Sequence, residues 1–329
     1  MSPAFTAGLR ALLALLAATA VSSANAQTPP LPQPGAWPQR GVRIVTPLPP
    51  GTGVDLTARL YADGFGKRWG QAVVVENRVG ADGIMATASF VAARDDHTLL
   101  LSIGAPFTSA PLTSEKLAYD PVGDVTPIGL ASEQYLALGV THGLAPRTLA
   151  EFEALARADP AKFNWAANTG LPQLSFLSFL KTARLDLAQV TYRDSSSALN
   201  DLGEGRIHVY LTGITTLTPQ LQAGKARLLA VLGRDRSPLY PDTPTVVEAG
   251  FPHMTVNGFT ALFGWKGMAP ELRDRIAADM QAVAADPAAR QRFAAAGLIL
   301  RFAAPDDLAR IMAEQRTWIA SVLGRGTDK

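Results

Sequence analysis

The stretch Val42 to Leu60, VRIVTPLPPGTGVDLTARL, contains the change of pattern on which the fold depends. A β-branched apolar run is followed by a Pro/Gly loop and then by a helical pattern, which predicts a strand, a loop and a helix N-terminus. Gly51, Thr52 and Gly53 leave backbone N–H groups uncovered where a helix has unpaired donors and the positive end of its dipole. The loop is therefore either a site for a carboxylate or another small anion, or a structural turn whose glycines satisfy only backbone geometry.

Residues 1–26 have the pattern of a secretory signal peptide, with Arg10 before a short apolar run and an A-x-A-like cleavage site that ends at Ala26. No later segment approaches the roughly 18 to 20 apolar residues that span a bilayer. We therefore expect an exported protein, in the periplasm or outside the cell. Residues 27–38 are rich in proline and predict an extended tether that leads into the first strand.

Composition narrows the classes of protein further. The formal net charge is only +2 and no Lys/Arg-rich run is present, so we expect no nucleic-acid partner. The chain has no cysteine, so an exported fold must be stable through its hydrophobic core without disulfides. Removal of the signal leaves about 300 residues, which is beyond the size at which one core usually stops growing and predicts two domains.

After the tether, short β-branched runs alternate with longer helical stretches, which predicts an α/β fold with largely parallel sheets. Two sets of four strands are expected, at 43–46, 72–76, 98–102 and 127–131, and at 163–166, 189–192, 208–212 and 228–232. Two further strands, at 135–141 and 256–265, are expected to carry the chain from one set to the other. Helices are expected at 55–69, 84–93, 174–182, 196–203 and 216–223, and near Pro270, Pro287 and Pro305.

This organisation predicts two α/β lobes with a cleft between them. We expect lobe 1 to comprise residues 39–132 plus 259–329 and lobe 2 to comprise residues 133–258, with hinge segments near 132–134 and 256–259. Ligands of open parallel sheets sit beyond the carboxyl ends of the strands, so the loops at these ends are candidate binding loops. They lie at 49–53 and 104–108 in lobe 1 and at 168–172, 193–197 and 212–216 in lobe 2. Their Gly, Ser, Thr and Asn residues supply neutral hydrogen-bond donors.

Catalytic motifs are missing from the sequence. It contains no G-x-S-x-G, P-loop or H-E-x-x-H pattern, and no cysteine nucleophile. The four histidines are scattered and no pair has the i, i+4 spacing of a helical metal site, so we expect neither a metal nor a cofactor. A secreted enzyme that uses Asp55 or Glu76 is a weaker alternative, because neither acid has a paired acid or base in the sequence to shift its pKa.

Several segments resemble one family in order along the chain. Residues 47–59, PLPPGTGVDLTAR, follow the pattern P-x-P-P-G-G-x-x-D-x-x-A-R, and similar blocks stand at 73–83, 117–130, 190–199 and 224–252. On these motifs, residues 40–323 resemble the Bug-type periplasmic solute-binding receptors of tripartite tricarboxylate transporters, the TctC-like family. The resemblance implies a two-lobed Venus-flytrap fold of the periplasmic-binding-protein class, type II-like, with two mixed, mainly parallel sheets and two crossover strands.

The resemblance also implies a function. Such a receptor captures a small organic carboxylate by lobe closure and delivers it to a membrane transporter, as a monomer and without catalysis. A ligand-sensing module that docks on a sensor kinase is the alternative. The resemblance implies ligand contacts through main-chain amides and short polar side chains. The candidate ligand-binding residues are Pro49, Gly51, Thr52, Gly53, Asp55 and Gly104 in lobe 1, and Asn168, Thr169, Gly170, Tyr192, Ser195 and Thr212 in lobe 2.

The sequence departs from the family pattern at several of these positions. Thr52 replaces the second glycine of the Gly-Gly pair, Asn168 replaces a serine, and Leu174 stands where a histidine is usual. His208 and Thr212 each replace an acid. Loss of the acid at Thr212 removes a partner for a ligand ammonium, so the comparison favours plain carboxylates, aromatic ones included.

Overall fold

A computed structural model describes residues 37–192, 194–295 and 298–324 of the chain. The expected signal peptide, residues 1–26, lies outside the described residues, and so does most of the expected tether. The chain divides into two units between Ala36 and Trp37, and all elements below belong to the second. No helix in the described ranges is long and apolar enough to cross a membrane.

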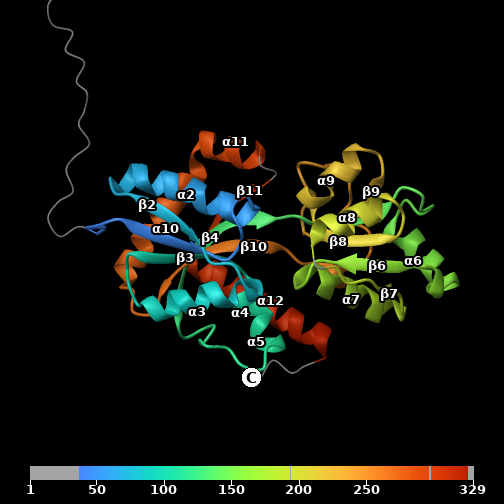
Figure 1. The fold of residues 1–329 in the computed structure, drawn as a ribbon, viewed down its shortest axis with the longest axis horizontal. Helices are drawn as coiled ribbons and strands as arrows, with labels where there is room; N and C mark the ends of the chain where they lie inside the picture. The colour runs from blue at the N-terminus through green and yellow to red at the C-terminus, as the bar shows by residue number, and fades with distance from the viewer. Residues whose placement is uncertain (1–36, 193, 296–297, 325–329) are drawn as a thin grey trace, which may run out of the picture. The chain divides into compact units, whose positions relative to one another are not determined.

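Two sheets organise the described chain (Figure 1). Sheet 1 contains β1 (Val42–Thr46), β2 (Val73–Asn77), β3 (Thr98–Ile103), β4 (Val125–Gln134), β10 (Gly258–Trp265) and β11 (Ile299–Ala303). Its strand order is β11-β4-β10-β3-β1-β2. Sheet 2 contains β5 (Leu136–Thr141), β6 (Asn164–Ala167), β7 (Ala188–Gln189), β8 (Val209–Gly213) and β9 (Ala226–Val231), in the order β7-β6-β8-β5-β9.

Helices connect the strands and cover both sheets. They are α2 (Gly53–Trp69), α3 (Ile84–Ala93), α4 (Ala105–Thr108), α5 (Ala110–Thr113), α6 (Leu149–Ala158), α7 (Leu171–Ala183), α8 (Ser195–Gly203), α9 (Ile214–Gln222), α10 (Pro270–Ala285), α11 (Pro287–Ala295) and α12 (Pro305–Leu323). Three short 3₁₀ turns, η1 (Ala81–Gly83), η2 (Pro160–Lys162) and η3 (Pro252–Met254), complete the set. The expected strands and helices are found, but α4, α5, α6 and β11 were not among them.

Both sheets are mixed. An interior strand that enters from the other sheet runs against its neighbours in each of them, and the edge strand β11 is also antiparallel to β4 in sheet 1. In sheet 1, β1 pairs in parallel with β2 and β3, whereas β10 is antiparallel to β3 and β4. In sheet 2, β6 is parallel to β7 and β8, whereas β5 is antiparallel to β8 and β9. The chain enters β5 directly from β4 and enters β10 after leaving sheet 2, which confirms the two predicted crossover strands. Most of the described strands in each sheet run in one direction, as expected.

The strand registers place the carboxyl ends of the strands beside these crossings. In sheet 1, Gly258 at the start of β10 pairs with Gln134 at the end of β4. In sheet 2, Leu136 at the start of β5 pairs with Gly213 at the end of β8. Only Tyr135 separates β4 from β5. The loops that follow the parallel strands of both sheets therefore open toward the connections between the sheets.

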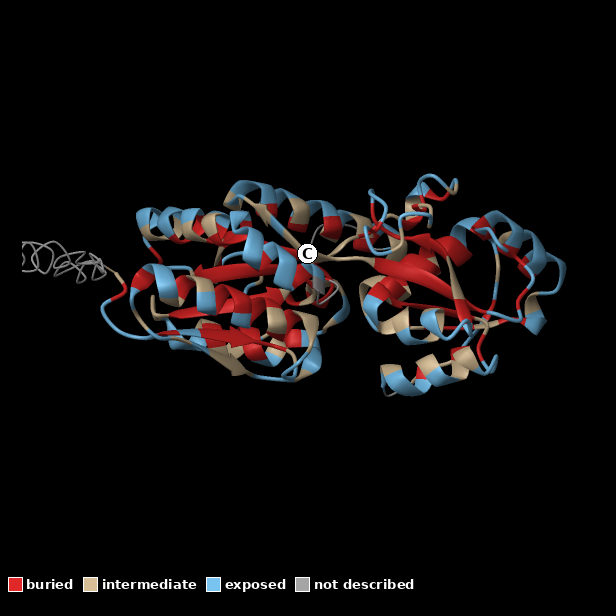
Figure 2. Ribbon diagram, turned by 90° about the horizontal axis from the view of Figure 1, so that it is seen from above, coloured by how far each residue is buried: buried red, intermediate tan, exposed pale blue. Residues whose placement is uncertain are grey.

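Each sheet is packed between two layers of helices. Buried residues concentrate on the strands and on the inward faces of the helices, as Figure 2 shows. On sheet 1, Val42 and Ile44 pack in a cluster with α2 and α10, whereas Val45 points to the opposite face and packs with α3 and α12. This alternation follows from the two-residue period of a strand. It explains why β1 is buried on both faces.

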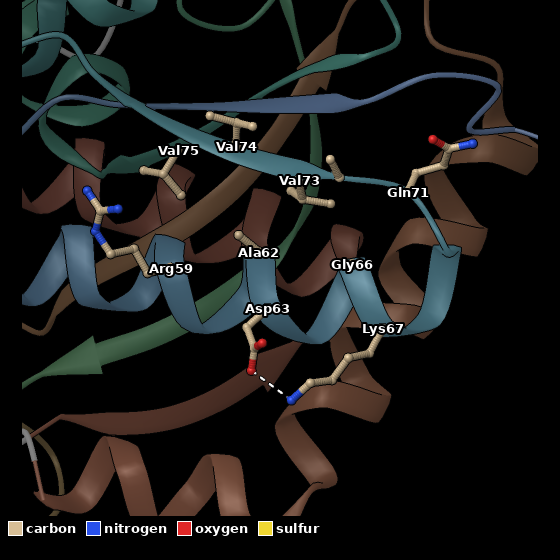
Figure 3. Close-up of a pocket in the computed structure, with 10 residues that line it drawn as sticks. Arg59, Ala62, Asp63, Gly66, Lys67, Gln71, Val73, Val74 and Val75 are labelled. Atoms are coloured by element: carbon tan, nitrogen blue, oxygen red, sulfur yellow. Dashed lines mark hydrogen bonds and ion pairs between the residues drawn. The ribbon is translucent and has the colours of Figure 1, made fainter.

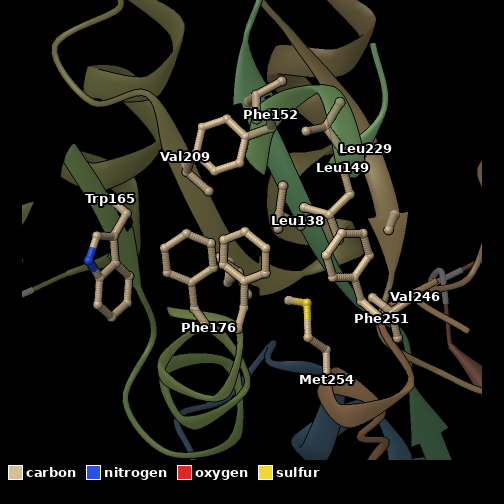
Figure 4. Packing of buried hydrophobic residues seen from close by; sticks show 14 of the residues in the cluster. Leu138, Leu149, Phe152, Trp165, Phe176, Val209, Leu229, Val246, Phe251 and Met254 are labelled. Carbon is tan, nitrogen blue, oxygen red and sulfur yellow. The ribbon is translucent and has the colours of Figure 1, made fainter. Parts of the chain in front are cut away.

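The core of sheet 2 is rich in aromatic side chains (Figure 4). The ring of Phe176, on α7, lies 4.7 Å from Trp165 and 5.3 Å from Phe179, measured between ring centroids. Trp165 donates its indole N–H to the carbonyl oxygen of Leu187 at 3.1 Å, so its only polar atom is satisfied. Trp165 is thus a core residue that fixes β6, which ends directly before the candidate loop at 168–172.

Helix α12 contacts the cores of both sheets. Leu308 and Met312, in its first half, pack in a core cluster of sheet 1. Trp318, near its end, packs against the core of sheet 2 and donates its indole N–H to the carbonyl oxygen of His253 at 3.0 Å. Between these points, Gln315 donates to the carbonyl oxygen of Asn257 at 3.1 Å, next to the second crossing. A helix expected to belong to lobe 1 alone therefore also holds sheet 2.

The Phe176→Ala variant is expected to lower the free energy of unfolding by about 3 to 5 kcal/mol, because it removes a fully buried aromatic ring and leaves a cavity. The exposed Val247→Ala change is the control and should alter stability by less than about 0.5 kcal/mol. Urea denaturation followed by circular dichroism measures both values. A Phe176→Ala protein as stable as the control would contradict the core position of this ring.

Candidate functional site

The Pro/Gly loop after β1 folds into a turn that ends in a capped helix. Thr52 is the N-cap of α2, and its hydroxyl accepts from the backbone N–H of Asp55 at 3.4 Å. The same hydroxyl donates to the carbonyl oxygen of Pro49 at 2.8 Å, and Leu56 N–H reaches the carbonyl of Thr52 at 2.8 Å. The threonine that departs from the family pattern is therefore a good helix cap.

Asp55 is buried beneath this loop and holds it through side-chain hydrogen bonds. Its side chain is only 1% exposed and accepts hydrogen bonds from the backbone N–H of Gly51 at 2.9 Å, from Arg59 at 2.9 and 3.0 Å, and from Asn77 at 2.8 Å. Burial by itself would raise the pKa of Asp55, but the hydrogen bonds from Arg59, Asn77 and Gly51 outweigh it and hold the pKa below its ordinary value. The carboxylate thus stays ionised and fixes the loop against α2 and β2.

This arrangement decides which donors remain for a ligand. The N–H of Gly51 is used by Asp55, whereas the backbone N–H groups of Gly53 and Val54 make no hydrogen bond to any described residue. Both belong to the first turn of a helix of 17 residues, where the dipole favours an anion. Gly53 is also close to the crossing, because a Cβ added to it would lie 3.5 Å from the side-chain nitrogen of Gln134.

Gly104, the second candidate in sheet 1, has a packing role. A Cβ at this position would lie 2.6 Å from the Phe259 ring and 3.1 Å from the side-chain oxygen of Gln315. Phe259 belongs to β10 and Gln315 to α12, so the small residue lets β3, β10 and α12 meet. The structure therefore places Gly104 at the end of β3 beside the second crossing, as the loop prediction requires.

In sheet 2, three polar side chains from different elements meet at the end of β6. Asn168 follows β6, and its side-chain oxygen accepts from the Tyr210 hydroxyl at 2.6 Å and from the Ser195 hydroxyl at 3.2 Å. Tyr210 lies on the neighbouring strand β8, opposite Ala166, and Ser195 is the first residue of α8. The structure thus brings Asn168 and Ser195 together as candidate residues and adds Tyr210, which the sequence analysis missed.

Thr212 lies on the same strand, two residues after Tyr210, and is fully buried. Its hydroxyl has no hydrogen-bond partner among the described residues. Burial raises the pKa of the Tyr210 phenol, while the nearby hydroxyls of Ser195 and Thr212 oppose the rise. The alternation of side chains along β8 is the signal that relates Tyr210 to the predicted Thr212.

The remaining candidates of sheet 2 differ in their surroundings. Thr169 is exposed and Gly170 is the N-cap residue of α7. The hydroxyl of Tyr192 donates to Asp201 at 2.6 Å instead of joining Asn168. Burial and the hydrogen bond to Asp201 raise the pKa of Tyr192 to about 12. The hydrogen bond from its phenol hydroxyl to Asp201 therefore holds Tyr192 against α8.

Other acids and histidines lie outside this arrangement. His208 precedes β8, at the end opposite to Thr212, and its ring nitrogen lies 2.7 Å from the side-chain oxygen of Asn164. Glu76 is paired with Arg43 and Arg78 on the edge of sheet 1. Within the part of the chain that the structure describes, no group of three or more acids and histidines could hold a metal ion.

A cavity of about 650 Å³ lies elsewhere, along α2 and the edge strand β2 (Figure 3). Its lining includes Lys67, which is paired with Asp63 at 2.9 Å, and the exposed side of β2 around Val74. No residue of sheet 2 and none of the candidate ligand-binding residues lines it. This cavity is therefore separate from the candidate site at the crossings.

Sequence comparisons relate the chain to one group of proteins. The family model described as tripartite tricarboxylate transporter family receptor matches residues 57–323. A UPF0065 protein of Bordetella bronchiseptica is 30% identical over 306 residues, which cover 93% of this chain and 89% of that protein. The protein BugT of Bordetella pertussis is 28% identical over 295 residues, 88% of this chain and 90% of its own length.

Solved structures agree with the fold described above. MatC of Rhodopseudomonas palustris with bound malate has a TM-score of 0.72 at 28% identity and covers 87% of this chain and 100% of its own. An R. palustris protein with adipate has a TM-score of 0.76 at 26% identity, with 88% and 99% covered. The periplasmic binding protein BugD has a TM-score of 0.72 at 26% identity, with 88% and 98% covered. The chain thus has the two-lobed fold of periplasmic binding proteins.

The Asp55→Asn variant is expected to lose about 1 to 3 kcal/mol of unfolding free energy at pH 7, because a buried carboxylate loses its charge-assisted hydrogen bonds. The folded-state pKa of Asp55 is lowered, so its stabilisation is complete above the unfolded pKa of about 3.9 and is lost as the pH falls through the folded value. The difference from wild type should therefore shrink below about pH 4. Urea denaturation at several pH values measures it, with the exposed Asp274→Asn change as the control. A difference that is constant with pH would contradict this role of Asp55.

Proposed function

The chain belongs to the tripartite tricarboxylate transporter family of receptors, and from this premise we propose that it captures a small organic carboxylate for transport. Relatives with the same fold were solved with malate and with adipate. The observation that carries the proposal is the register of β4, β5, β8 and β10, which opens the binding loops of both sheets toward the same crossings. A ligand held there touches both sheets at once.

One carboxylate of the ligand binds at the first turn of α2. The free N–H groups of Gly53 and Val54 donate to it, and Thr52 and Asp55 hold the loop in place. Because Arg59 already neutralises Asp55, the dipole of the helix attracts the anion without a free cationic side chain. Gly51 and Pro49 shape the turn. Gly104 shapes the neighbouring loop.

The other end of the ligand binds at the carboxyl ends of β6 and β8. Asn168 and Ser195 provide neutral polar groups there, the buried Thr212 lies behind them, and Thr169, Gly170 and Tyr192 lie around them. Thr212 is neutral where the family pattern has an acid, so this position supplies no carboxylate for an ammonium group. Plain carboxylates are therefore favoured over amino acids.

Binding is coupled to lobe closure. A ligand that touches both sheets stabilises the closed state, and residues 132–134 and 256–259 absorb the change in backbone angles. We assign residues 39–132 and 259–329 to lobe 1 and residues 133–258 to lobe 2, with α12 as a further contact between them. The closed monomer, exported by its signal peptide to the periplasm, then docks on the membrane transporter. Nothing in the structure favours a sensor kinase over the transporter as its partner.

The receptor binds its ligand and does not transform it. Asp55 is surrounded by donors, and Glu76 by two arginines, so neither carboxylate is placed to accept or deliver a proton. Thermal shift and calorimetry with malate, adipate, longer dicarboxylates and aromatic acids test the proposal. We expect at least one of these to raise the melting temperature and to bind with one-to-one stoichiometry. Failure of the whole panel to bind would overturn the carboxylate assignment.

Gly53→Pro is expected to weaken carboxylate binding about 10- to 100-fold, because it removes a donor to a charged group worth roughly 1.5 to 3 kcal/mol. Gly53 is the first residue of α2, where proline is compatible with a helix. A Cβ at this position lies 2.9 Å from a methyl group of Leu298, and this contact is the same in the alanine control. Gly53→Ala is the matched control, since it adds a Cβ but keeps the N–H. Calorimetry with a carboxylate that binds the wild type measures the affinity of both variants. Equal affinities of Gly53→Pro and Gly53→Ala would show that the loop is only a turn.

A further inference from the structure

The side-chain amide of Asn168 is held by two hydroxyl groups on one side. Both the Tyr210 hydroxyl, at 2.6 Å, and the Ser195 hydroxyl, at 3.2 Å, donate to its oxygen. The backbone N–H of Asn168 is bonded to the carbonyl of Leu211 at 3.0 Å, so the residue is also fixed to β8. The oxygen is thus satisfied, and the side-chain nitrogen makes no hydrogen bond to any described residue.

Tyr210 itself is not available to a ligand. The residue is 1% exposed and its ring packs in a core cluster of sheet 2 with Ala166 and Leu202. Its hydroxyl donates to Asn168, so its effect on a ligand passes through that residue. Tyr210 belongs to β8 and Asn168 follows β6, and these two strands are adjacent in the sheet. The hydrogen bond between Tyr210 and Asn168 is therefore donated from a strand and not from a loop.

The surroundings of Asn168 contain a second polar group without a partner. Thr212 is on the same face of β8 as Tyr210, is fully buried, and leaves its hydroxyl unpaired within the described ranges. The nearby acids are already engaged. Asp194 caps α8 by accepting from the N–H and hydroxyl of Ser197, and Asp201 accepts from Tyr192 and Arg206.

We propose that Tyr210 is a positioning residue that turns the Asn168 amide so that its two N–H groups face the ligand. Sheet 2 then selects a ligand end that accepts hydrogen bonds, such as a second carboxylate. An ammonium or amide N–H at the same end meets the N–H donors of Asn168 where it needs an acceptor. This selection rests on the proposed function, because it requires the ligand to lie at the carboxyl ends of β6 and β8. The positioning of Asn168 by Tyr210 exists in the free protein as well.

Three variants test the proposal. Tyr210→Phe removes one hydroxyl and keeps the packed ring. Asn168→Asp keeps the oxygen that accepts from Tyr210 and Ser195 but replaces both N–H donors with a second oxygen. Tyr240→Phe is the matched control, because it removes the hydroxyl of another tyrosine that packs against the same core cluster but is bonded to Thr218 and not to Asn168. Melting temperatures check that each variant is folded, and Ser195→Ala replaces Tyr210→Phe if the latter does not fold.

The first measurement needs no ligand. In ¹⁵N-labelled protein, the side-chain amide signals of Asn168 are identified by their absence from the Asn168→Asp spectrum. We expect these signals to move or broaden in Tyr210→Phe and to stay unchanged in Tyr240→Phe. Identical Asn168 signals in wild type and Tyr210→Phe would overturn the positioning role.

The second measurement is calorimetry with adipate, malate and the monoamide of adipic acid as probes. We expect Tyr210→Phe to weaken dicarboxylate binding about tenfold and to reduce the preference for adipate over its monoamide. Asn168→Asp should weaken dicarboxylate binding at least 100-fold and shift the preference toward the monoamide, whereas Tyr240→Phe should change neither. An unchanged preference in both variants would overturn the selection. If wild type binds none of the probes, the proposed function fails for these acids and the amide signals alone decide the role of Tyr210.

Discussion

The structure depends on the way in which each sheet accepts a strand from the other. β5 enters sheet 2 one residue after the chain leaves β4, and β10 enters sheet 1 on its return, each antiparallel to its neighbours. β4 ends at the carboxyl ends of the parallel strands of sheet 1, and β5 begins at the carboxyl ends of the parallel strands of sheet 2. Because only Tyr135 joins β4 to β5, these ends of the two sheets must face each other. This constraint fixes the orientation of both sheets at once. The parallel strands then direct their loops toward the connections, and the N-termini of α2, α7 and α8 follow. The candidate binding loops of both sheets therefore lie at the connections between the sheets.

The architecture was largely predictable from the sequence, because the alternation of apolar runs with helical stretches is strong in both halves. The two crossover strands were also predicted, since residues 135–141 and 256–265 are apolar runs outside the two sets. α6 was missed although Thr148 and Glu151 form a capping pattern before apolar residues at helical spacing. β11 was missed for a physical reason. It is an edge strand whose residues are half-buried or exposed, so it lacks the apolar alternation that marks a strand.

The candidate site was predictable at the level of loops but not at the level of atoms. Sequence placed Gly51, Gly53 and Asp55 on one loop, but it could not show that Asp55 uses the N–H of Gly51 and leaves that of Gly53. It found Asn168 and Ser195 separately, on segments 27 positions apart. Their meeting with Tyr210 requires β6 and β8 to be adjacent, which is a property of strand order and not of local pattern. Long-range pairing of this kind leaves no periodic trace in a single sequence.

Helix α12 gives the two sheets a third attachment besides the two crossing strands. Two neighbouring strands alone would permit both bending and twisting of one lobe against the other. A helix that is packed into one core by Leu308 and Met312, and joined to the other by Trp318, links the two sheets at points away from the crossing strands. Any relative movement of the two sheets must therefore be accommodated at these helix contacts as well as at the strands that cross between the sheets. The last helix of the described chain thus helps to hold the two sheets that carry the candidate binding loops, although none of the candidate ligand-binding residues lies on it.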